Sequence, residues 1–414
     1  MMYSMNPVRI GIVGGGQLGK MLAMEAKRMS MRVNILDPSE DCPASMLADE
    51  VIVSGFNDAE AVTRLAEMSD VVTYEIELAD ADLLERLERK GHRIRPPASA
   101  LRIVQDKFMQ KHVLRKNGIP VADFFPIKGM DDLHSIAGEI GYPLMLKAKK
   151  GGYDGRGNML VKGDVSMDRV KGFVGARGGW DAVYVERFIP FIKEVSVIVA
   201  RSSKGEVVAY PVAENVHDNG ILDTSIVPAR IPEPLAERAR EIAMDVIEAL
   251  GGIGVFGVEM FVAKGSMGGR RDSGEGAGAY VHGYADEGEG DGYILVNEVA
   301  PRVHNTGHYS IEACNVSQFE QHIRAILDLP LVEPRMVCRA AAMVNILGNE
   351  SIDGYYAIDG IERVMGMGAR VHIYGKRSNR GRRKLGHVTI LGDDIDSVIR
   401  AAMQIKSTIR LVSV

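Results

Sequence analysis

Acidic side chains occur inside two apolar segments that are typical of β-strands. Glu259 lies in the segment 255–263, and Glu298 lies in the segment 293–300. A carboxylate within a buried strand is unfavourable unless it is paired or bound to a metal ion. Two such acids on paired strands suit Mg²⁺, which takes one or two carboxylates together with phosphate oxygens and water. The pattern predicts a magnesium site at Glu259 and Glu298, with Asn297 nearby; a salt-bridged structural acid is the alternative.

A glycine-rich segment follows Lys147, which ends an apolar strand. Four glycines fall between Gly151 and Gly157, and their backbone N–H groups can fold over phosphates. A lysine on the preceding strand supplies a point charge for the same phosphates. Lys107, at the start of a predicted helix over 106–118, could supply another. We therefore expect a nucleotide phosphate site here, although a lone lysine is more often simply solvated.

The segment 14–19 reads Gly-Gly-Gly-Gln-Leu-Gly and follows a predicted strand. It has the spacing of a dinucleotide-binding turn, and Asp37 lies about where such folds place their ribose-binding acid. Nicotinamide binding is therefore one interpretation. The same glycines also suit any tight strand-to-helix turn, with or without a phosphate beside it.

Two polar segments complete the set. The turn after the second acidic strand carries Arg302, His304 and Asn305, and an arginine beside a metal ion can bind a small oxyanion through two hydrogen bonds. The segment 374–387 holds six cations and no acid. A solvated loop or an RNA contact would explain it, but in an acidic chain it favours a phosphorylated substrate.

The predicted elements distribute these motifs over three domains. Residues 1–100 alternate strands with helices, which indicates βαβ units and a doubly wound parallel sheet. Residues 101–190 form a small α+β unit, and residues 191–414 form a larger, strand-rich α+β unit. The stretch 264–292 has ten glycines in 29 residues. It has too few apolar groups to offset its ordering entropy, so we expect a flexible insertion.

Composition excludes several classes of protein. The 414 residues include 50 Lys and Arg against 55 Asp and Glu, a net charge of −5, which argues against a nucleic-acid or membrane-surface binder. The three cysteines form no C-x-x-C pair, so neither a disulfide framework nor a zinc site is indicated. No apolar run reaches about 18 residues, so no transmembrane helix is expected. We expect a cytoplasmic protein.

Taken together, the motifs resemble the ATP-grasp superfamily. Within it the chain is similar to the 5-(carboxyamino)imidazole ribonucleotide synthase family, the ATP-dependent part of phosphoribosylaminoimidazole carboxylase. The similarity covers almost the whole chain. The matching segments, in the order of the family, are 14–19, 73–77, 151–157, 214–222, 297–309 and 383–387.

The resemblance implies a fold and a reaction. The fold is an ATP-grasp architecture, an α/β and α+β mixture with an N-terminal pre-ATP-grasp domain, a central lid domain and a C-terminal domain. The reaction is the carboxylation of 5-aminoimidazole ribonucleotide by bicarbonate and ATP, through carboxyphosphate, with release of ADP and phosphate, in purine biosynthesis. ATP and Mg²⁺ are the implied cofactors, and a homodimer is the implied assembly. The loop at 151–158 would shield carboxyphosphate from water.

The resemblance also implies roles for individual residues. ATP would be bound by Lys107, Lys147, Gly152, Tyr153, Asp154, Gly155, Arg156, Gly157, Asn158, Glu186, Arg187, Phe188, Ile189, Glu194, His217, Asn297 and Glu298. Mg²⁺ would be bound by Glu259 and Glu298. The aminoimidazole ribonucleotide would contact Gln17, Leu18, Glu75, Tyr153, Asp154, Arg156, Lys376 and Arg383. The implied catalytic group is Arg302, His304 and Asn305, which would hold bicarbonate, together with Lys376.

Four alternative functions are also compatible with some of these motifs. Another ATP-grasp enzyme of purine synthesis, such as the formate-dependent glycinamide ribonucleotide transformylase, would share the core, and a biotin carboxylase would share the bicarbonate chemistry. A nicotinamide-linked oxidoreductase would use the segment 14–19 with Asp37, but the paired acids Glu259 and Glu298 argue against it. A non-catalytic nucleotide sensor is disfavoured because the phosphate and metal positions are all present.

Overall fold

The computed structural model describes residues 7–152, 157–163, 165–265 and 292–414. Its N-terminal part is a parallel sheet of four strands in the order β3-β2-β1-β4. Strand β1 is buried: helices cover its Ile10, Ile12 and Val13, and the apolar stripe of α1 is part of this cover. The elements are β1 (Arg9–Val13), α1 (Gln17–Arg28), β2 (Arg32–Asp37), β3 (Glu50–Val53), α2 (Ala59–Glu67), β4 (Val71–Tyr74) and α3 (Ala81–Arg89). The predicted parallel sheet is confirmed.

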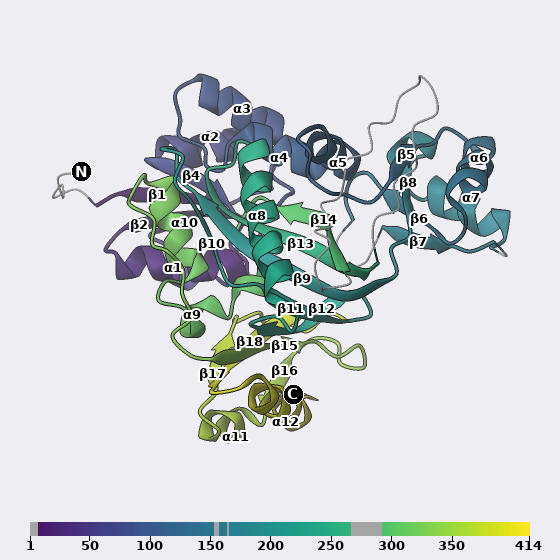
Figure 1. Cartoon of the computed structure of the whole chain (residues 1–414). Helices are drawn as coiled ribbons and strands as arrows, with labels where there is room; N and C mark the ends of the chain where they lie inside the picture. Colours follow the sequence, from purple (N-terminus) through teal and green to yellow (C-terminus); the bar gives the residue numbers. More distant parts are fainter. Residues whose placement is uncertain (1–6, 153–156, 164, 266–291) are drawn as a thin grey trace.

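Two helices connect this sheet to a small antiparallel sheet, whose strand order is β5-β8-β6-β7. Figure 1 shows this small sheet with α6 and α7 projecting to one side of the molecule. The predicted domain boundary at residue 100 falls inside α4. The prediction rested on the Pro96-Pro97 break, and this break lies directly before the helix begins. The elements are α4 (Ala98–Gln105), α5 (Lys107–Lys116), β5 (Phe124–Pro126), α6 (Met130–Ile140), β6 (Leu144–Ala148), β7 (Asn158–Val161), α7 (Met167–Gly175) and β8 (Val183–Arg187).

The remaining strands form a nine-stranded sheet in the order β14-β13-β9-β11-β12-β15-β18-β17, with β10 paired to β9. A separate pair, β16 and β19, completes the C-terminal end. The strands are β9 (Phe191–Arg201), β10 (Val207–Ala209), β11 (Ala213–Asp218), β12 (Ile221–Val227), β13 (Gly254–Lys264), β14 (Gly292–Ala300), β15 (Ala340–Leu347), β16 (Tyr356–Asp359), β17 (Arg370–Ile373), β18 (Lys384–Gly392) and β19 (Arg410–Ser413). The helices are α8 (Glu233–Ala249), α9 (Ser310–Ala313), α10 (Gln318–Ile326), α11 (Ile361–Gly366) and α12 (Ile395–Thr408).

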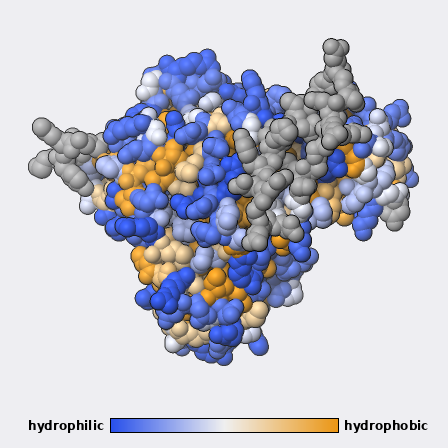
Figure 2. Space-filling view, in the orientation of Figure 1, coloured by the Kyte–Doolittle hydropathy of each residue, from blue (hydrophilic) through white to orange (hydrophobic). Residues whose placement is uncertain are grey.

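Helix α10 joins the N-terminal sheet to the nine-stranded sheet. It packs against α1 of the N-terminal part and against β13 of the nine-stranded sheet, and its Phe319, Ile323 and Ile326 are buried. One hydrophobic cluster consequently spans both parts, which holds the turn after β1 near the acidic strands. The face in Figure 2 is mostly hydrophilic with scattered hydrophobic patches. Among the described residues, no helix combines the length and the hydrophobicity needed to cross a membrane.

Candidate active site

Glu259 and Glu298 are directly opposite each other on β13 and β14. Their side chains are 25% and 41% exposed. Burial, and then the nearby charge of Glu298, raises the pKa of Glu259 to about 7. A divalent cation would relieve this repulsion, so the pair fits Mg²⁺. Among the described residues, no group of three or more His, Cys, Asp and Glu side chains is arranged to hold a metal. An ion at this pair would therefore take its other ligands from phosphate and water.

Lys107 begins helix α5 beside this acidic pair. The Asp106 carboxylate accepts a hydrogen bond from the Met109 amide at 3.0 Å, so it caps the helix and fixes where the helix starts. The Lys107 ammonium donates to Glu298 Oε2 at 2.8 Å. Burial alone would lower the pKa of Lys107, but the attraction of Glu298 outweighs it and the pKa is raised. Lys107 is therefore a cation held at the predicted metal and phosphate site.

Lys147 belongs to a buried cluster that the sequence did not predict. Its ammonium donates to Glu186 Oε1 at 3.0 Å and to Asn297 Oδ1 at 3.3 Å. The other Glu186 oxygen lies 3.1 Å from the ammonium of Lys111, whose side chain is 2% exposed. Sequence reasoning assigned Glu186 to the adenine hinge, whereas the structure places its carboxylate between two lysines. The spacing of Lys111 one helical turn after Lys107 was the available signal.

Other residues assigned to ATP lie on β8, β9 and β11 and in the connection from β8 to β9. Glu194 Oε2 of β9 is 2.5 Å from His217 Nδ1 of β11. Burial alone would lower the pKa of His217, but its contact with Glu194 raises the pKa overall. Arg187 ends β8 and donates to Asp123 at 2.9 Å, and Ile189 is buried. Phe188 lies between them in the connection from β8 to β9 and is partly buried.

The predicted phosphate loop is described only at its two ends. The Ala148 amide donates to the Gly157 carbonyl at 2.8 Å, and Lys147 is opposite Asn158 in the pairing of β6 with β7. Gly157 has a φ of +103°, a conformation that glycine adopts readily. The start and end of the loop are therefore held side by side next to Lys147. Tyr153, Asp154, Gly155 and Arg156 lie outside the described residues, as does most of the predicted insertion at 264–292.

The turn after β14 brings Arg302 and His304 to the acidic pair. Arg302 makes an ion pair with Glu77 at 2.8 Å. His304 Nε2 lies 3.6 Å from Glu259 Oε1, and its Nδ1 lies 2.9 Å from Thr306 Oγ1. Burial, and then the charge of Arg302, lowers the pKa of His304 well below its usual value. The turn therefore presents a neutral imidazole and a paired guanidinium at one edge of the acidic pair.

Asn305 is arranged differently from the expectation that it faces bicarbonate. Its amide nitrogen donates to Asn345 Oδ1 at 3.1 Å, and the Asn345 amide donates back to Asn305 Oδ1 at 2.8 Å. Both side chains are buried. Because both ends of the Asn305 amide meet Asn345, the role that these contacts support is fixing the turn after His304.

The glycine-rich turn at 14–19 carries a carboxylate at its centre. Glu75 accepts hydrogen bonds from the amides of Gly16 and Gly19, the latter at 2.8 Å. A Cβ on residue 16 would lie 2.5 Å from Glu75 Oε1, which explains why glycine is needed there. Burial raises the pKa of Glu75 even though these amides oppose the shift. An anion at the start of α1 is therefore supplied by the protein itself.

This arrangement restricts how the turn can meet a substrate. Leu18 is 5% exposed and packs into the core, so the backbone is the part of it that can face a ligand. Gln17 is the first residue of α1. Asp37 accepts a hydrogen bond from the Gly15 amide at 2.8 Å, so it supports the turn as well. These hydrogen bonds hold the turn in place and put a carboxylate beside it. The turn therefore suits a polar ligand better than a pyrophosphate.

The basic segment joins the C-terminal and N-terminal parts. Arg377 makes an ion pair with Asp41 at 2.6 Å. The Lys376 ammonium donates to the Lys384 carbonyl at 2.8 Å, and its charge acts on Glu75. Arg383 is exposed. Lys376 and Arg383 therefore remain the cations best placed for a phosphorylated substrate near the glycine-rich turn.

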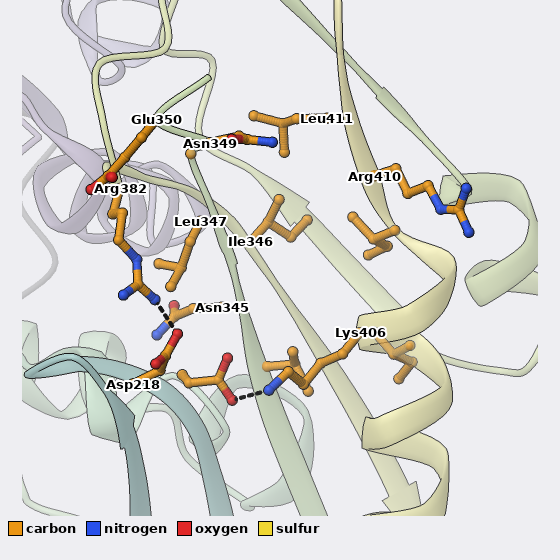
Figure 3. A pocket seen from close by; sticks show the side chains of 15 residues that line it. Asp218, Asn345, Ile346, Leu347, Asn349, Glu350, Arg382, Lys406, Arg410 and Leu411 are labelled. Atoms are coloured by element: carbon orange, nitrogen blue, oxygen red, sulfur yellow. Dashed lines mark hydrogen bonds and ion pairs between the residues drawn. The ribbon is translucent and has the colours of Figure 1, made fainter. Parts of the chain in front are cut away.

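A cavity of about 650 Å³ lies behind this segment, between β15 and the end of α12. Figure 3 shows Arg382 pointing to Asp218, and these two side chains are 2.5 Å apart. Lys406 makes a second ion pair with Asp223 at 2.7 Å. Asn345 also lines the cavity, so the cavity touches the back of the turn that carries Asn305. The acidic pair and the three lysines of the site do not line it.

Family models match three consecutive parts of the chain. A ribonucleotide synthetase pre-ATP-grasp domain matches residues 7–105, and an ATP-grasp domain matches residues 112–319. The C-terminal domain of phosphoribosylaminoimidazole carboxylase matches residues 341–401. The three matches follow the order expected from the resemblance in the sequence.

Individual relatives agree with these matches. The N5-carboxyaminoimidazole ribonucleotide synthase of Bacillus subtilis is 36% identical over 392 residues, 94% of this chain and 93% of its own. A chloroplastic phosphoribosylaminoimidazole carboxylase of Vigna aconitifolia is 38% identical, and the chain spans 65% of that longer protein.

Solved structures show the same likeness. The N5-carboxyaminoimidazole ribonucleotide synthetase of Thermotoga maritima has a TM-score of 0.83 at 42% identity, covering 98% of this chain and all of the other. The synthase of Aspergillus clavatus, solved with ADP and 5-aminoimidazole ribonucleotide, has a TM-score of 0.80 at 33% identity, covering 97% and 98% of the two chains. The chain therefore belongs to the N5-carboxyaminoimidazole ribonucleotide synthase family of ATP-grasp ligases.

Proposed function

We propose that this chain carboxylates the amine of 5-aminoimidazole ribonucleotide, using ATP and bicarbonate, and releases ADP and phosphate. The observation that carries the proposal is the grouping of Lys107 and the Glu259–Glu298 pair with the turn of Arg302 and His304. One site thus combines cations for phosphate, carboxylate oxygens for a metal ion, and hydrogen-bond donors for a small oxyanion. The Aspergillus relative, solved with ADP and the same ribonucleotide, supports the choice of substrates.

ATP would lie with its phosphates between Lys107 and Lys147. Lys107 begins α5, and Lys147 is the next-to-last residue of β6. The Lys107 amide donates to the Lys149 carbonyl at 2.8 Å, which fixes the two segments together. Glu194 would accept from the ribose, and Glu259 and Glu298 would hold Mg²⁺. When bound there, Mg²⁺ would neutralise charge on the phosphate oxygens. Spreading the charge of the transferring phosphoryl group in this way is the main catalytic demand.

Bicarbonate would be held by Arg302, whose charge acts on His304 beside Glu259. A bicarbonate oxygen attacks the γ-phosphorus, the bond from that phosphorus to the ADP oxygen breaks, and carboxyphosphate forms. The neutral imidazole of His304 lies at the same edge and can accept or donate a hydrogen bond there. Both side chains are mostly buried, at 17% exposure each, so few water molecules reach the intermediate.

The ribonucleotide would lie between the glycine-rich turn and the basic segment. Glu75 would accept hydrogen bonds from the substrate, and Lys376 and Arg383 would bind its phosphate. The amine then forms a bond to the carboxyl carbon, either of carboxyphosphate or of the carbon dioxide released from it. Inorganic phosphate leaves, and the product amine loses a proton. The glycine-rich turn and the basic segment come from opposite ends of the sequence, and Lys20 Nζ donates to the Ile373 carbonyl at 3.0 Å where they meet.

The test is ADP release with Mg²⁺ and bicarbonate, measured with and without aminoimidazole ribonucleotide. Strong stimulation by this nucleotide is the expected result. Stimulation by glycinamide ribonucleotide and formate instead would keep the ATP-grasp chemistry and reject the substrate. A Glu259→Gln variant controls for a contaminating ATPase, because it should lose the stimulated rate.

We also propose that the chain acts as a homodimer in the cytoplasm. The family resemblance supports the homodimer, and light scattering on the purified chain tests it. The thiols of Cys42, Cys314 and Cys338 are free, which supports a reducing compartment. Fractionation of the source cells would test the location.

A further inference from the structure

Three charged side chains form a buried cluster next to the proposed phosphate site. Glu186 lies at its centre, with Lys147 at one carboxylate oxygen and Lys111 at the other, at 3.0 and 3.1 Å. The side chains of Lys111 and Glu186 are 2% and 3% exposed, and that of Lys147 is 11% exposed. Lys147 is therefore the member that reaches the site, and the other two stand behind it.

The charges of this cluster determine what Lys147 offers to a phosphate. Lys147 and Glu186 alone would form a neutral buried pair, whose field at the site would be small. Lys111 adds a second positive charge behind the carboxylate, so the cluster of two lysines and one glutamate has a net charge of +1. Because the interior screens charge weakly, this difference is felt strongly at the phosphate position.

We propose that Lys111 is a positioning residue for ATP, which neutralises Glu186 so that Lys147 keeps its positive charge available to the phosphates. This inference rests on the proposed function. Geometry supports it further, because the Lys111 ammonium also donates to the Val296 carbonyl of β14 at 3.3 Å. Lys111 thus ties α5 to the strand that carries Asn297, the second partner of Lys147.

Other titratable groups lie beside the cluster. The charge of Glu298 on β14 acts on Lys111, and Glu298 is itself paired with Lys107 of α5. The phenol oxygen of Tyr184 on β8 is 3.4 Å from Glu186 Oε2. Burial raises the pKa of Tyr184 well above its usual value, so this phenol stays neutral. Burial lowers the pKa of Lys111 to about 8, although Glu186 opposes the shift. In the free enzyme, Lys111 should therefore lose its proton as the pH rises through about 8.

The experiment compares three variants with the unaltered chain, using calorimetric binding of ADP with Mg²⁺ and the KM for ATP. Lys111→Met gives the cluster a net charge of zero, and it should weaken nucleotide binding by roughly tenfold to a hundredfold, as expected for a lost charged hydrogen bond. The double variant Lys111→Met/Glu186→Gln restores the net charge of +1 and should recover most of that loss. Lys116→Met, on an exposed position of the same helix, is the control and should bind normally.

A pH series separates positioning from mere structural support. In the unaltered chain, nucleotide affinity should fall as the pH rises through about 8, whereas the double variant should show no such fall. An unrecovered double variant, or a fall that persists in it, would overturn the inference. The KM for aminoimidazole ribonucleotide should be unchanged throughout. If the unaltered chain binds ADP but ignores that ribonucleotide, the proposed substrate fails while the role of Lys111 stands.

Discussion

Gln318 holds the backbone of His304 at both ends. Its Oε1 accepts from the His304 amide at 2.9 Å, and its Nε2 donates to the His304 carbonyl at 2.7 Å. Gln318 is fully buried at the start of α10. Helix α10, which joins the N-terminal sheet to the nine-stranded sheet, therefore also fixes the turn that carries the proposed bicarbonate residues.

Replacing Gln318 with Met should leave the backbone amide of His304 without a partner, whereas the His304 carbonyl keeps the hydrogen bond that it accepts from the Gly307 amide at 3.0 Å. We expect a loss of roughly 2 kcal/mol or more in the free energy of unfolding, measured by urea titration. We also expect a lower kcat, with less change in the KM for ATP. A variant with normal stability and a normal kcat would show that the turn does not depend on this side chain.

Glu259→Gln and Glu298→Gln should each weaken metal activation. Each removes a negative oxygen from the pair that faces the proposed ion, so the Mg²⁺ concentration for half-maximal rate should rise at least about tenfold. Mn²⁺ binding followed by electron paramagnetic resonance measures the same loss without turnover. Glu248→Gln, at an exposed acid on α8, is the matched control. Unchanged metal affinity in both site variants would place the ion elsewhere.

Arg302→Lys should raise the KM for bicarbonate by roughly tenfold or more. Lysine keeps the charge but cannot make the two parallel hydrogen bonds of a guanidinium, and it would meet Glu77 less well. The KM for ATP should change less, because Arg302 pairs with Glu77, whereas Lys107 and Lys147 pair with Glu298 and Glu186. The same exchange at Arg377, an exposed arginine paired with Asp41, serves as the control. Equal effects at the two positions would refute a specific bicarbonate role.

His322 should make the stability of the protein depend on pH. Its Nδ1 accepts from the Val255 amide at 3.1 Å, so the neutral ring carries its proton on Nε2, which lies 2.8 Å from Thr73 Oγ1. Burial lowers the pKa of His322 to about 3. As the pH falls below about 6.5, the unfolded chain binds a proton that the folded chain does not, and stability is lost down to about pH 3.

His322→Gln keeps both hydrogen bonds possible and removes the titration. Its free energy of unfolding should therefore depend less steeply on pH between 6 and 4 than that of the unaltered chain, by up to about 1.4 kcal/mol per pH unit. His134→Gln, at an exposed histidine on α6, should keep the steep slope. Parallel curves for all three proteins would contradict the assignment.

Local patterns predicted the strands and helices that carry the proposed site residues. The strands of Glu259 and Glu298 were predictable because apolar alternation marked them and the glycine-rich stretch between them implied pairing, and the antiparallel pair is confirmed. The order of the N-terminal strands and helices followed from the same periodicity. These features depend on residues close together in the sequence.

Contacts between distant residues were not predictable in this way. Lys111 looks like an ordinary helical lysine until β8 brings Glu186 to it from 75 positions away. The pairing of Asn305 with Asn345 depends on β15 passing behind the turn. Glu75 meets the glycine-rich turn because β4 lies next to β1. Each contact depends on how elements that are distant in the sequence pack together, and the periodicity of the sequence does not show this packing.

The position of β14 at the end of its sheet has a consequence for assembly. An edge strand usually offers unpaired amides and carbonyls to any neighbouring chain. Here the Val296 amide donates to the Pro120 carbonyl, and the Gln110 side chain bonds both backbone groups of Val299. The strand that carries Glu298 is thus covered by the protein's own α5 and the segment that follows it. It can face solvent and substrate without becoming a template for aggregation.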